Sequence, residues 1–200
     1  QGYCFGCMRT LAACDMCIMK PELCHFDQGT CREPEWAQSH CMQDHFIYLA
    51  NSSGLKVGIT RHTQVPTRWI DQGAIAALPI GRVKNRLQSG LVESEIKNHV
   101  DDSTNWQKML KGVIDFIDLE EKRDEILNYW PENIMGEPLM NEKITIIEYP
   151  VLEYPKKVTS LNLDKEPIVE GTLLGIKGQY LILDVGVINM RKYQGYEIQW

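Results

Sequence analysis

The chain has 200 residues, of which 44% are hydrophobic and 24% are charged, and its formal net charge is −6. This composition is that of a globular protein with one large domain or two to three small ones, and it excludes low-complexity and collagen-like chains. No apolar run approaches the roughly 20 residues of a membrane span, and no signal peptide is recognisable, so we expect a cytoplasmic protein. The first residue is Gln rather than Met, as in a fragment or a processed chain.

Charge is unevenly distributed along the chain. Residues 46–112 carry nine Lys or Arg and five acidic residues, a net of +4, whereas residues 113–170 carry six basic and fourteen acidic residues, a net of −8. A local basic face is what phosphate binding needs, so the net charge argues only weakly against a nucleic-acid partner. The alternative is that these Lys and Arg residues solvate exposed helix faces.

Cysteines are confined to residues 1–44, where two pairs have the CxxC spacing. An odd number of cysteines without a secretory signal argues against a disulfide framework. A CxxC turn lets two thiolates reach one tetrahedral metal ion, so the segment predicts structural zinc binding. The predicted ligands are Cys4, Cys7, Cys14, Cys17, Cys24, Cys31 and Cys41.

The spacing does not decide which of these cysteines bind the same metal ion. The two CxxC turns form one site by themselves, or two sites exist and the second takes its ligands from the five cysteines between Cys14 and Cys41, with His25 and His40 as alternates. The segment has few large aliphatic side chains, so metal binding would supply free energy for its folding. The other readings are free buried cysteines and a redox-active CxxC, which lacks the βαβ context that would support it.

Residues 45–60 contain two short apolar runs, Phe46 to Ala50 and Leu55 to Thr60, separated by Asn51 to Gly54. Both runs are rich in β-branched or aromatic residues, which predicts two strands joined by a tight turn. Gly58 lies inside the second strand, where a glycine often marks the close approach of another backbone or a ligand.

A helix and a third strand are predicted next. Val65–Pro66 opens the helix, because proline is tolerated in a first turn, and Gly73 ends it. Arg68 then lies near the helix N-terminus. The composition of residues 74–83 predicts a third strand, broken late by Pro79.

A second helix is predicted from Gly90 to about Val100, capped by Ser89. It carries Glu93, four residues before Lys97, so the two side chains are spaced to form an ion pair. Residues 103–130 are also predicted to be helical, with a turn around Trp106 and then a strongly acidic helix.

The last third of the chain has a different sequence pattern, with a linker and then short runs typical of strands. Residues 131–142 are predicted to be a linker, and residues 143–200 contain short β-rich runs punctuated by glycines. This pattern predicts a small antiparallel sheet or half-barrel. Four aromatic residues there are expected in its core and at its edges, the alternative being that they stack on bases: Tyr180, Tyr193, Tyr196 and Trp200.

The runs IYL (47–49) and KVG (56–58) resemble the two half-motifs of the GIY-YIG nucleases, in the branch whose second half-motif begins with lysine. Arg68 and Glu93 follow in the family's order of strand, strand, helix with Arg, strand, helix with Glu. The resemblance covers roughly residues 45–100, with Phe46 in place of the first glycine. The whole chain also resembles an uncharacterised bacterial family known only as a domain of unknown function, which suggests a further CxxC upstream of residue 1.

The GIY-YIG resemblance implies a role for each matched residue. Tyr48 would orient or deprotonate water, and Lys56, directly across the hairpin, would lower its pKa. Arg68 would hold the scissile phosphate with its planar fork, and Glu93 would hold Mg²⁺. His45 or His62 is the alternative base. The competing reading is that Tyr48 is a half-buried strand residue and that Glu93 pairs with its helix neighbour.

We therefore expect an α+β protein. Its parts are a cysteine-rich zinc-binding segment (1–44), a GIY-YIG-like α/β domain with C-terminal helices (45–130), a linker (131–142) and a small β domain (143–200). The leading expected function is metal-dependent cleavage of DNA or RNA. The alternatives are a non-catalytic nucleic-acid- or protein-binding zinc protein and a purely structural interaction protein, which the acidic stretch would suit.

Overall fold

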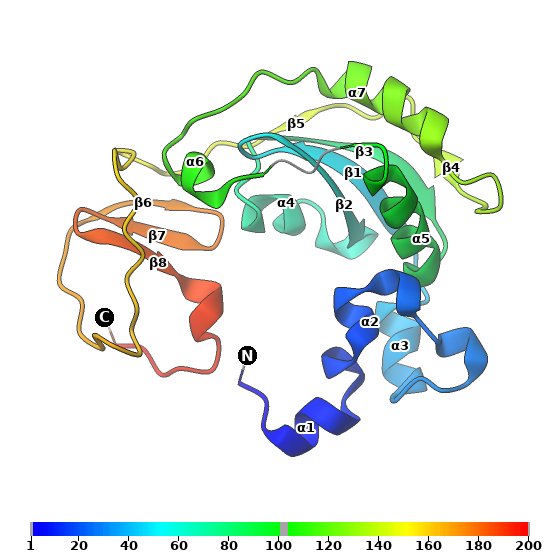
Figure 1. The fold of residues 1–200 in the computed structure, drawn as a ribbon, viewed down its shortest axis with the longest axis horizontal. Helices are drawn as coiled ribbons and strands as arrows, with labels where there is room; N and C mark the ends of the chain where they lie inside the picture. The colour runs from blue at the N-terminus through cyan, green and yellow to red at the C-terminus, as the bar shows by residue number, and fades with distance from the viewer. Residues whose placement is uncertain (1, 101–103, 200) are drawn as a thin grey trace.

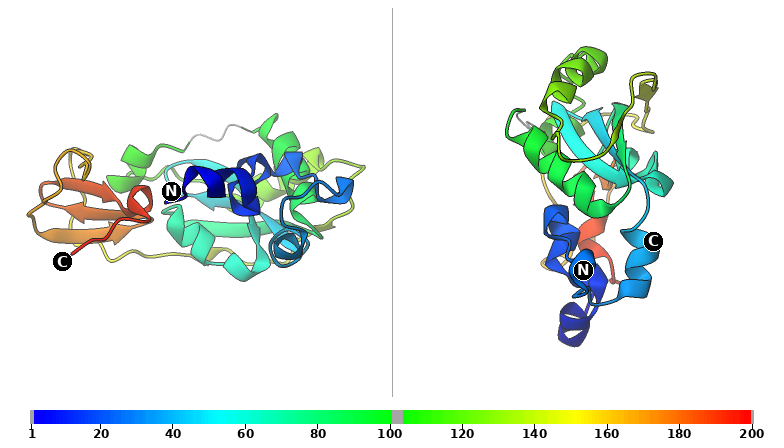
Figure 2. Two further views of the ribbon diagram at one scale, coloured as in Figure 1. Left: turned by 90° about the horizontal axis from the view of Figure 1, so that it is seen from below. Right: turned by 90° about the vertical axis from the view of Figure 1, so that its right-hand side faces the viewer.

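The computed structural model of the chain describes residues 2–100 and 104–199. The structure has a central antiparallel sheet and two smaller regions. The cysteine-rich segment lies near one end of the molecule, and a second sheet, formed by the C-terminal residues, lies at the other (Figures 1 and 2). The expected mixture of helices and antiparallel sheets behind a cysteine-rich N-terminus is confirmed.

The central sheet is built on a hairpin. Strands β1 (His45–Asn51) and β2 (Leu55–Arg61) pair antiparallel, from His45 opposite Arg61 to Asn51 opposite Leu55. Strand β3 (Ala76–Val83) pairs with the other edge of β1, which gives the order β2-β1-β3. The two strands expected in residues 45–60 are therefore present.

The two faces of this sheet are covered by different helices (Figure 1). Ile47 and Leu49 point to the face covered by α5 (Arg86–Lys97) and α7 (Leu119–Ile126), where they join the largest core cluster. Tyr48 and Ala50 point to the opposite face, covered by α4 (Thr67–Asp71). This alternation along β1 is the period of two that a sheet buried on both faces requires.

Pro79 does not break the third strand as expected. The pairing of β1 with β3 shifts between Ile47 and Tyr48, so that Ile47 lies opposite Gly81 and Tyr48 lies opposite Pro79. A bulge of this kind leaves one residue out of the ladder, and proline, which has no N–H to donate, is tolerated in such a place. The strand therefore continues to Val83.

Helix α5 begins earlier than the sequence indicated. Its N-cap is Asn85, whose side chain accepts a hydrogen bond from the backbone N–H of Gln88 (2.9 Å). Ser89, the expected cap, lies inside the helix and donates to the carbonyl of Arg86 (2.7 Å). Gly90 packs against Pro21 and Glu22, where a Cβ would lie 2.4 Å from the Glu22 nitrogen. The helix thus docks closely on the cysteine-rich segment.

Residues 104–147 contain less helix and more sheet than expected. Helix α6 (Trp106–Leu110) and helix α7 are present, but residues 113–118 between them are not helical. In the expected linker, β4 (Glu137–Pro138) pairs with β3, as does β5 (Thr145–Ile146) from the expected β domain. Strands β4 and β5 are both held by backbone hydrogen bonds to β3, whose free edge can accept a further strand. The composition of a short segment does not reveal such pairing.

The C-terminal sheet is an antiparallel meander of β6 (Leu173–Lys177), β7 (Tyr180–Leu183) and β8 (Gly186–Asn189). Ile182 and Val187 pack against Met109 and Leu110 of α6, and Tyr180 stacks on Trp106 with ring centroids 5.8 Å apart. The small antiparallel sheet is therefore present, and Trp200, one of the aromatic residues expected in it, lies outside the described residues.

The cysteine-rich segment has only short helices: α1 (Phe5–Thr10), α2 (Met16–Met19) and α3 (Pro34–His40). Single 3₁₀ turns connect elements here and elsewhere, at Ala12–Cys14, Pro21–Leu23, Phe26–Gln28, His62–Gln64, Leu127–Tyr129 and Met190–Tyr193. Among the described residues, no helix is both long and apolar enough to cross a membrane.

Candidate functional site

Four of the seven predicted zinc ligands line one small pocket in the cysteine-rich segment. Cys17 comes from α2, Cys24 follows the turn after it, Cys31 lies in a loop, and Cys41 follows α3. Three of these thiols are buried and that of Cys31 is half-buried. We call this group, Cys17, Cys24, Cys31 and Cys41, the thiol pocket.

Burial and mutual repulsion oppose ionisation of two of these thiols, Cys17 and Cys41. The pKa of Cys41 is raised to about 11, mainly by burial and to a smaller extent by the neighbouring thiols, while Arg86 acts in the opposite direction. The pKa of Cys17 is raised by burial first and then by Asp15 and the other thiols. Because the thiolate is the form that binds metals, a cation is needed to make the pocket anionic at neutral pH.

The remaining cysteines form a second group near the chain's N-terminus. The backbone N–H of Cys7 donates to the Cys4 sulfur (3.5 Å), and this contact lowers the pKa of Cys4. Cys14 is close enough for its charge to raise the pKa of Cys7. The second CxxC is therefore divided, with Cys14 beside the first pair and Cys17 in the thiol pocket. This geometry favours two groups over one site made of both CxxC turns.

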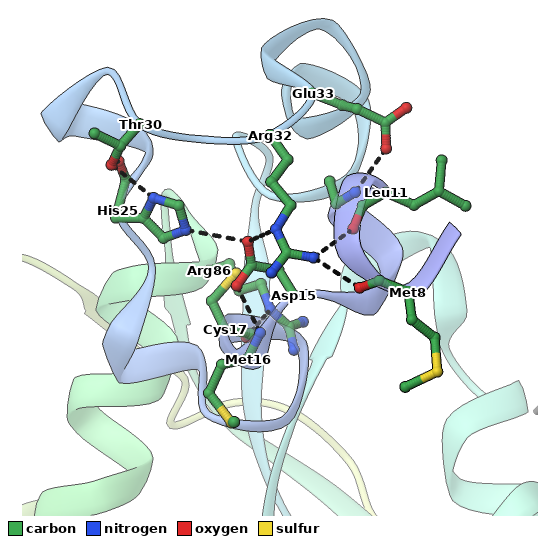
Figure 3. Close-up of polar contacts among 11 residues, drawn as sticks. Met8, Leu11, Asp15, Met16, Cys17, His25, Thr30, Arg32, Glu33 and Arg86 are labelled. Atoms are coloured by element: carbon green, nitrogen blue, oxygen red, sulfur yellow. Dashed lines mark hydrogen bonds and ion pairs between the residues drawn. The ribbon is translucent and has the colours of Figure 1, made fainter. Parts of the chain in front are cut away.

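A carboxylate, a thiol and an imidazole also meet beside the pocket (Figure 3). The ligand atoms of Asp15, Cys17 and His25 lie within 4.8 Å of one another. However, the Asp15 carboxylate already accepts hydrogen bonds from Arg32 Nε (2.7 Å) and the Met16 N–H (2.6 Å). Both of its oxygens are therefore in use.

The two histidines considered as alternate ligands have other contacts. His25 contacts Asp15 through Nε2 (3.4 Å) and Thr30 through Nδ1 (2.7 Å). His40 stacks on Trp36, with ring centroids 4.0 Å apart.

Figure 3 shows that Arg32, besides its contact with Asp15, also donates to the carbonyls of Met8 (3.0 Å) and Leu11 (3.3 Å). This network joins the turns that carry the cysteines.

A tetrahedral four-thiolate zinc site, with Zn–S bonds of about 2.3 Å, places its sulfur atoms roughly 3.8 Å apart. Within the described ranges, only the group of Asp15, Cys17 and His25 has its ligand atoms within 4.8 Å. Binding by the thiol pocket would therefore draw its four sulfur atoms together. The cysteine-rich segment is compatible with a metal such as zinc through either set.

In the central domain, Tyr48 and Arg68 lie near each other on the α4 side of the sheet, and Glu93 belongs to α5, which packs on the other face. The Tyr48 hydroxyl donates to Gln72 Oε1 (2.8 Å). Arg68, one helical turn before Gln72, is close enough to lower the pKa of Tyr48 by its charge and by hydrogen bonding, and the charge of Glu93 also reaches this hydroxyl. Gln72 was missed by the sequence analysis, although it is spaced to share a helix face with Arg68.

The environment of Tyr48 is unlike that expected of a base. Its side chain is 0% exposed, and burial raises its pKa to about 12 despite Arg68. At neutral pH Tyr48 is therefore a neutral hydrogen-bond donor. Its ring lies over Gly58, where a Cβ would be 2.6 Å from the hydroxyl oxygen, so the close approach expected at this glycine is made by Tyr48.

Lys56 is not directly across the hairpin from Tyr48, so that expectation is wrong. Tyr48 pairs with Gly58, and Lys56 pairs with Ala50. The three-residue turn at 52–54 sets this register, and the period of two places Lys56 on the same face as Tyr48 but diagonal to it.

The other predicted site residues differ in accessibility. Glu93 accepts a hydrogen bond from Lys97 Nζ (3.0 Å), and its side chain is 16% exposed. His45 is buried, and its burial lowers its pKa to about 4. His62 is exposed at the end of β2 and contacts the Asp44 carbonyl (3.4 Å). Of the two alternative bases, only His62 is open to solvent.

Several basic side chains of residues 46–112 form ion pairs or hydrogen bonds within the protein. Arg82 forms ion pairs with Glu137 and Asp44, and Lys84 also pairs with Asp44. Arg86 donates to backbone carbonyls of the cysteine-rich segment. These three of the nine basic side chains of this stretch are therefore engaged in contacts within the fold.

Comparisons with known proteins agree with the broader of the two resemblances. No curated protein and no solved structure matches the chain. The match is to a family described as "Protein of unknown function (DUF2797)" and covers residues 1–198. Because it spans nearly the whole sequence, the chain belongs to this family.

Proposed function

We propose that the central domain binds the phosphodiester backbone of DNA or RNA and cleaves it with the help of a divalent cation. The observation that carries this proposal is that Arg68 of α4 lies close to the Tyr48 hydroxyl of β1, with Glu93 of α5 near enough for its charge to act on that hydroxyl. These are residues that the GIY-YIG resemblance selects from the sequence alone. Their approach in space is independent support for the same site.

Each residue has a role that suits its surroundings. Arg68 would hold a non-bridging phosphate oxygen pair with its planar fork. Tyr48, held neutral by burial, would donate a hydrogen bond rather than accept a proton. Glu93 offers the hard oxygen ligand that Mg²⁺ prefers, and such an ion would offset the negative charge that develops on the phosphate. His62 is the accessible candidate for the base.

We also propose that the thiol pocket holds zinc with a structural role. The cysteines of the pocket come from four separate places in a segment whose buried residues are mostly small. Four thiolates and one zinc ion would close these turns into a single unit.

The catalytic proposal is tested with two substitutions and their matched controls. Glu93→Gln and Arg68→Lys should each lower Mg²⁺-dependent cleavage of short DNA and RNA by ~10²–10³, the scale for loss of one preorganised electrostatic group. Glu95→Gln and Arg82→Lys, at exposed ion pairs on α5 and β3, should leave it unchanged. Equal effects in variants and controls would contradict the assignment.

A non-catalytic binding protein is the second candidate, and it is favoured by the burial of Tyr48 and the Glu93–Lys97 pair. Binding separates the two candidates. Arg68→Lys should weaken binding of nucleic acid, whereas Glu93→Gln should leave it equal or tighter because a repulsive charge is removed. If the wild-type protein binds but never cuts, the binding function is correct. If it does neither, the third class, a structural interaction protein, is supported.

A further inference from the structure

Arg86 joins the cysteine-rich segment to the central domain. It is the first residue of α5, and its guanidinium donates to the carbonyls of Cys17 (Nε, 3.3 Å) and Ile18 (Nη2, 2.7 Å). Its backbone N–H donates to the Cys41 carbonyl (2.9 Å). A single residue thus contacts both ends of the thiol pocket's sequence, on α2 and after α3.

The position is unfavourable for a cation. No acidic side chain lies in the first turn of α5, and Arg86 forms no ion pair with any residue in the ranges 2–100 and 104–199. The positive end of the helix dipole lies at the same terminus. Arg61 is close enough to act on Arg86 as a like charge, and the side chain is partly removed from water. A partly buried cation without a counter-ion is costly.

The groups facing Arg86 that could carry negative charge are thiols of the pocket, Cys17, Cys24 and Cys41. Four thiolates around one Zn²⁺ have a net charge of −2. Such a centre would attract Arg86 at short range in a partly desolvated site and would offset the repulsion from Arg61 and from the helix dipole. Thiols in their neutral form would not.

We propose that Arg86 is the counter-ion of the metal–thiolate centre and positions α5 against it. This inference rests on the proposal that the thiol pocket holds the metal. It extends that proposal to the central domain, because Glu93 lies two helical turns beyond Arg86 on the same helix. Loading of the thiol pocket would thus stabilise the start of the helix that carries a predicted catalytic residue.

The test separates charge from hydrogen bonding. Arg86→Gln can still donate to a carbonyl but has no charge, whereas Arg86→Lys keeps the charge. Zinc affinity is measured by competition with a chromogenic chelator, and thermal unfolding is followed for zinc-loaded and chelator-treated protein. Arg82→Gln, which removes an arginine four residues upstream whose side chain is 40% exposed, is the matched control.

We expect Arg86→Gln to weaken zinc binding by ~10–100-fold, the usual scale for a residue that supports metal ligands. We expect Arg86→Lys to bind within a few-fold of wild type. The Gln variant should lower the Tm of the loaded protein but not that of the stripped protein, because the charge has no partner there. Equal zinc affinity of wild type and the Gln variant would overturn the role of Arg86 while leaving the metal site intact. Failure of the wild type to bind zinc would overturn both.

Discussion

The cysteine-rich segment and the central sheet are held together by different means. The sheet buries large aliphatic side chains on its α5 face, including Ile47, Leu49, Leu78 and Ile80, all fully buried. Residues 2–44 bury only small side chains, prolines and cysteines, while Phe5, Met16 and Met19 are exposed. A fully buried aliphatic side chain contributes about 1.5–3 kcal/mol. The sheet can therefore be stable on hydrophobic burial, whereas the segment needs another source of free energy.

Removal of the metal should produce the largest difference in stability between the two regions. Structural zinc supplies ~10–16 kcal/mol of apparent binding free energy in small metal-dependent modules, so its loss should open the cysteine-rich segment. Amide hydrogen exchange with and without a strong chelator should show lost protection in α2 and α3 but retained protection in β1 to β3. Equal loss in both regions would contradict the division. Cys4→Ser, outside the thiol pocket, is the control and should change α2 and α3 little.

Truncation of the sheet's core should give the opposite pattern. Leu49→Ala removes a fully buried side chain from the largest core cluster and should cost about 2–5 kcal/mol of unfolding free energy. Chemical denaturation of the zinc-loaded protein measures the loss. Zinc affinity should change little, because Leu49 belongs to the sheet's core. A large fall in zinc affinity would show that the two regions do not have separate sources of stability.

These two regions also differ in how far the sequence predicts them. The hairpin, the third strand and the helix carrying Arg68 follow from local composition and turn residues. The grouping of cysteines does not, because it depends on how four turns fold back in space and separates Cys14 from Cys17. The wrong partner of Lys56 could have been avoided, because counting outward from a turn of either three or four residues never places Lys56 opposite Tyr48. The pairing of β4 and the contacts of Arg86 are long-range and have no local signal.

Protonation of His45, the first residue of β1 after the cysteine-rich segment, should make the stability of the protein depend on pH. The Nε2 atom of His45 is buried without a hydrogen-bond partner among the described residues, and this burial is the main cause that lowers its pKa. Arg86 and Arg61 lower the pKa further, while the Gln43 carbonyl and Asp44 act in the opposite direction. Its pKa falls to about 4 in the folded chain from 6.5, so the unfolded state binds more protons between these values. The contribution of neutral His45 to the free energy of unfolding is therefore fully present above pH 6.5. The free energy of unfolding should fall by about 3 kcal/mol as the pH drops toward 4.

Urea unfolding between pH 4 and pH 7 measures this loss for wild type and His45→Asn. The variant lacks the imidazole, so its stability should depend less on pH in this window, and the difference isolates His45 from the protonation of other groups. Superimposable pH profiles would contradict the assignment.

The smallest expected effect is at the cap of α5. Asn85→Ala removes the side-chain acceptor for the Gln88 N–H and should cost about 1 kcal/mol. Thermal unfolding of zinc-loaded protein measures it, with Asn98→Ala, at the other end of the same helix, as the control. A cost equal to that of the control would show that the helix start is held by the cysteine-rich segment alone.

The central claim is that the thiol pocket holds a metal ion on which the cysteine-rich segment depends. Native mass spectrometry of the wild-type protein and of the Cys24→Ser variant tests it most directly, because intact mass reports bound zinc and disulfide formation together. The account predicts at least one zinc ion per wild-type chain and one fewer in the variant. A folded wild-type chain that carries no zinc, with its cysteines free or joined in disulfides, would contradict it.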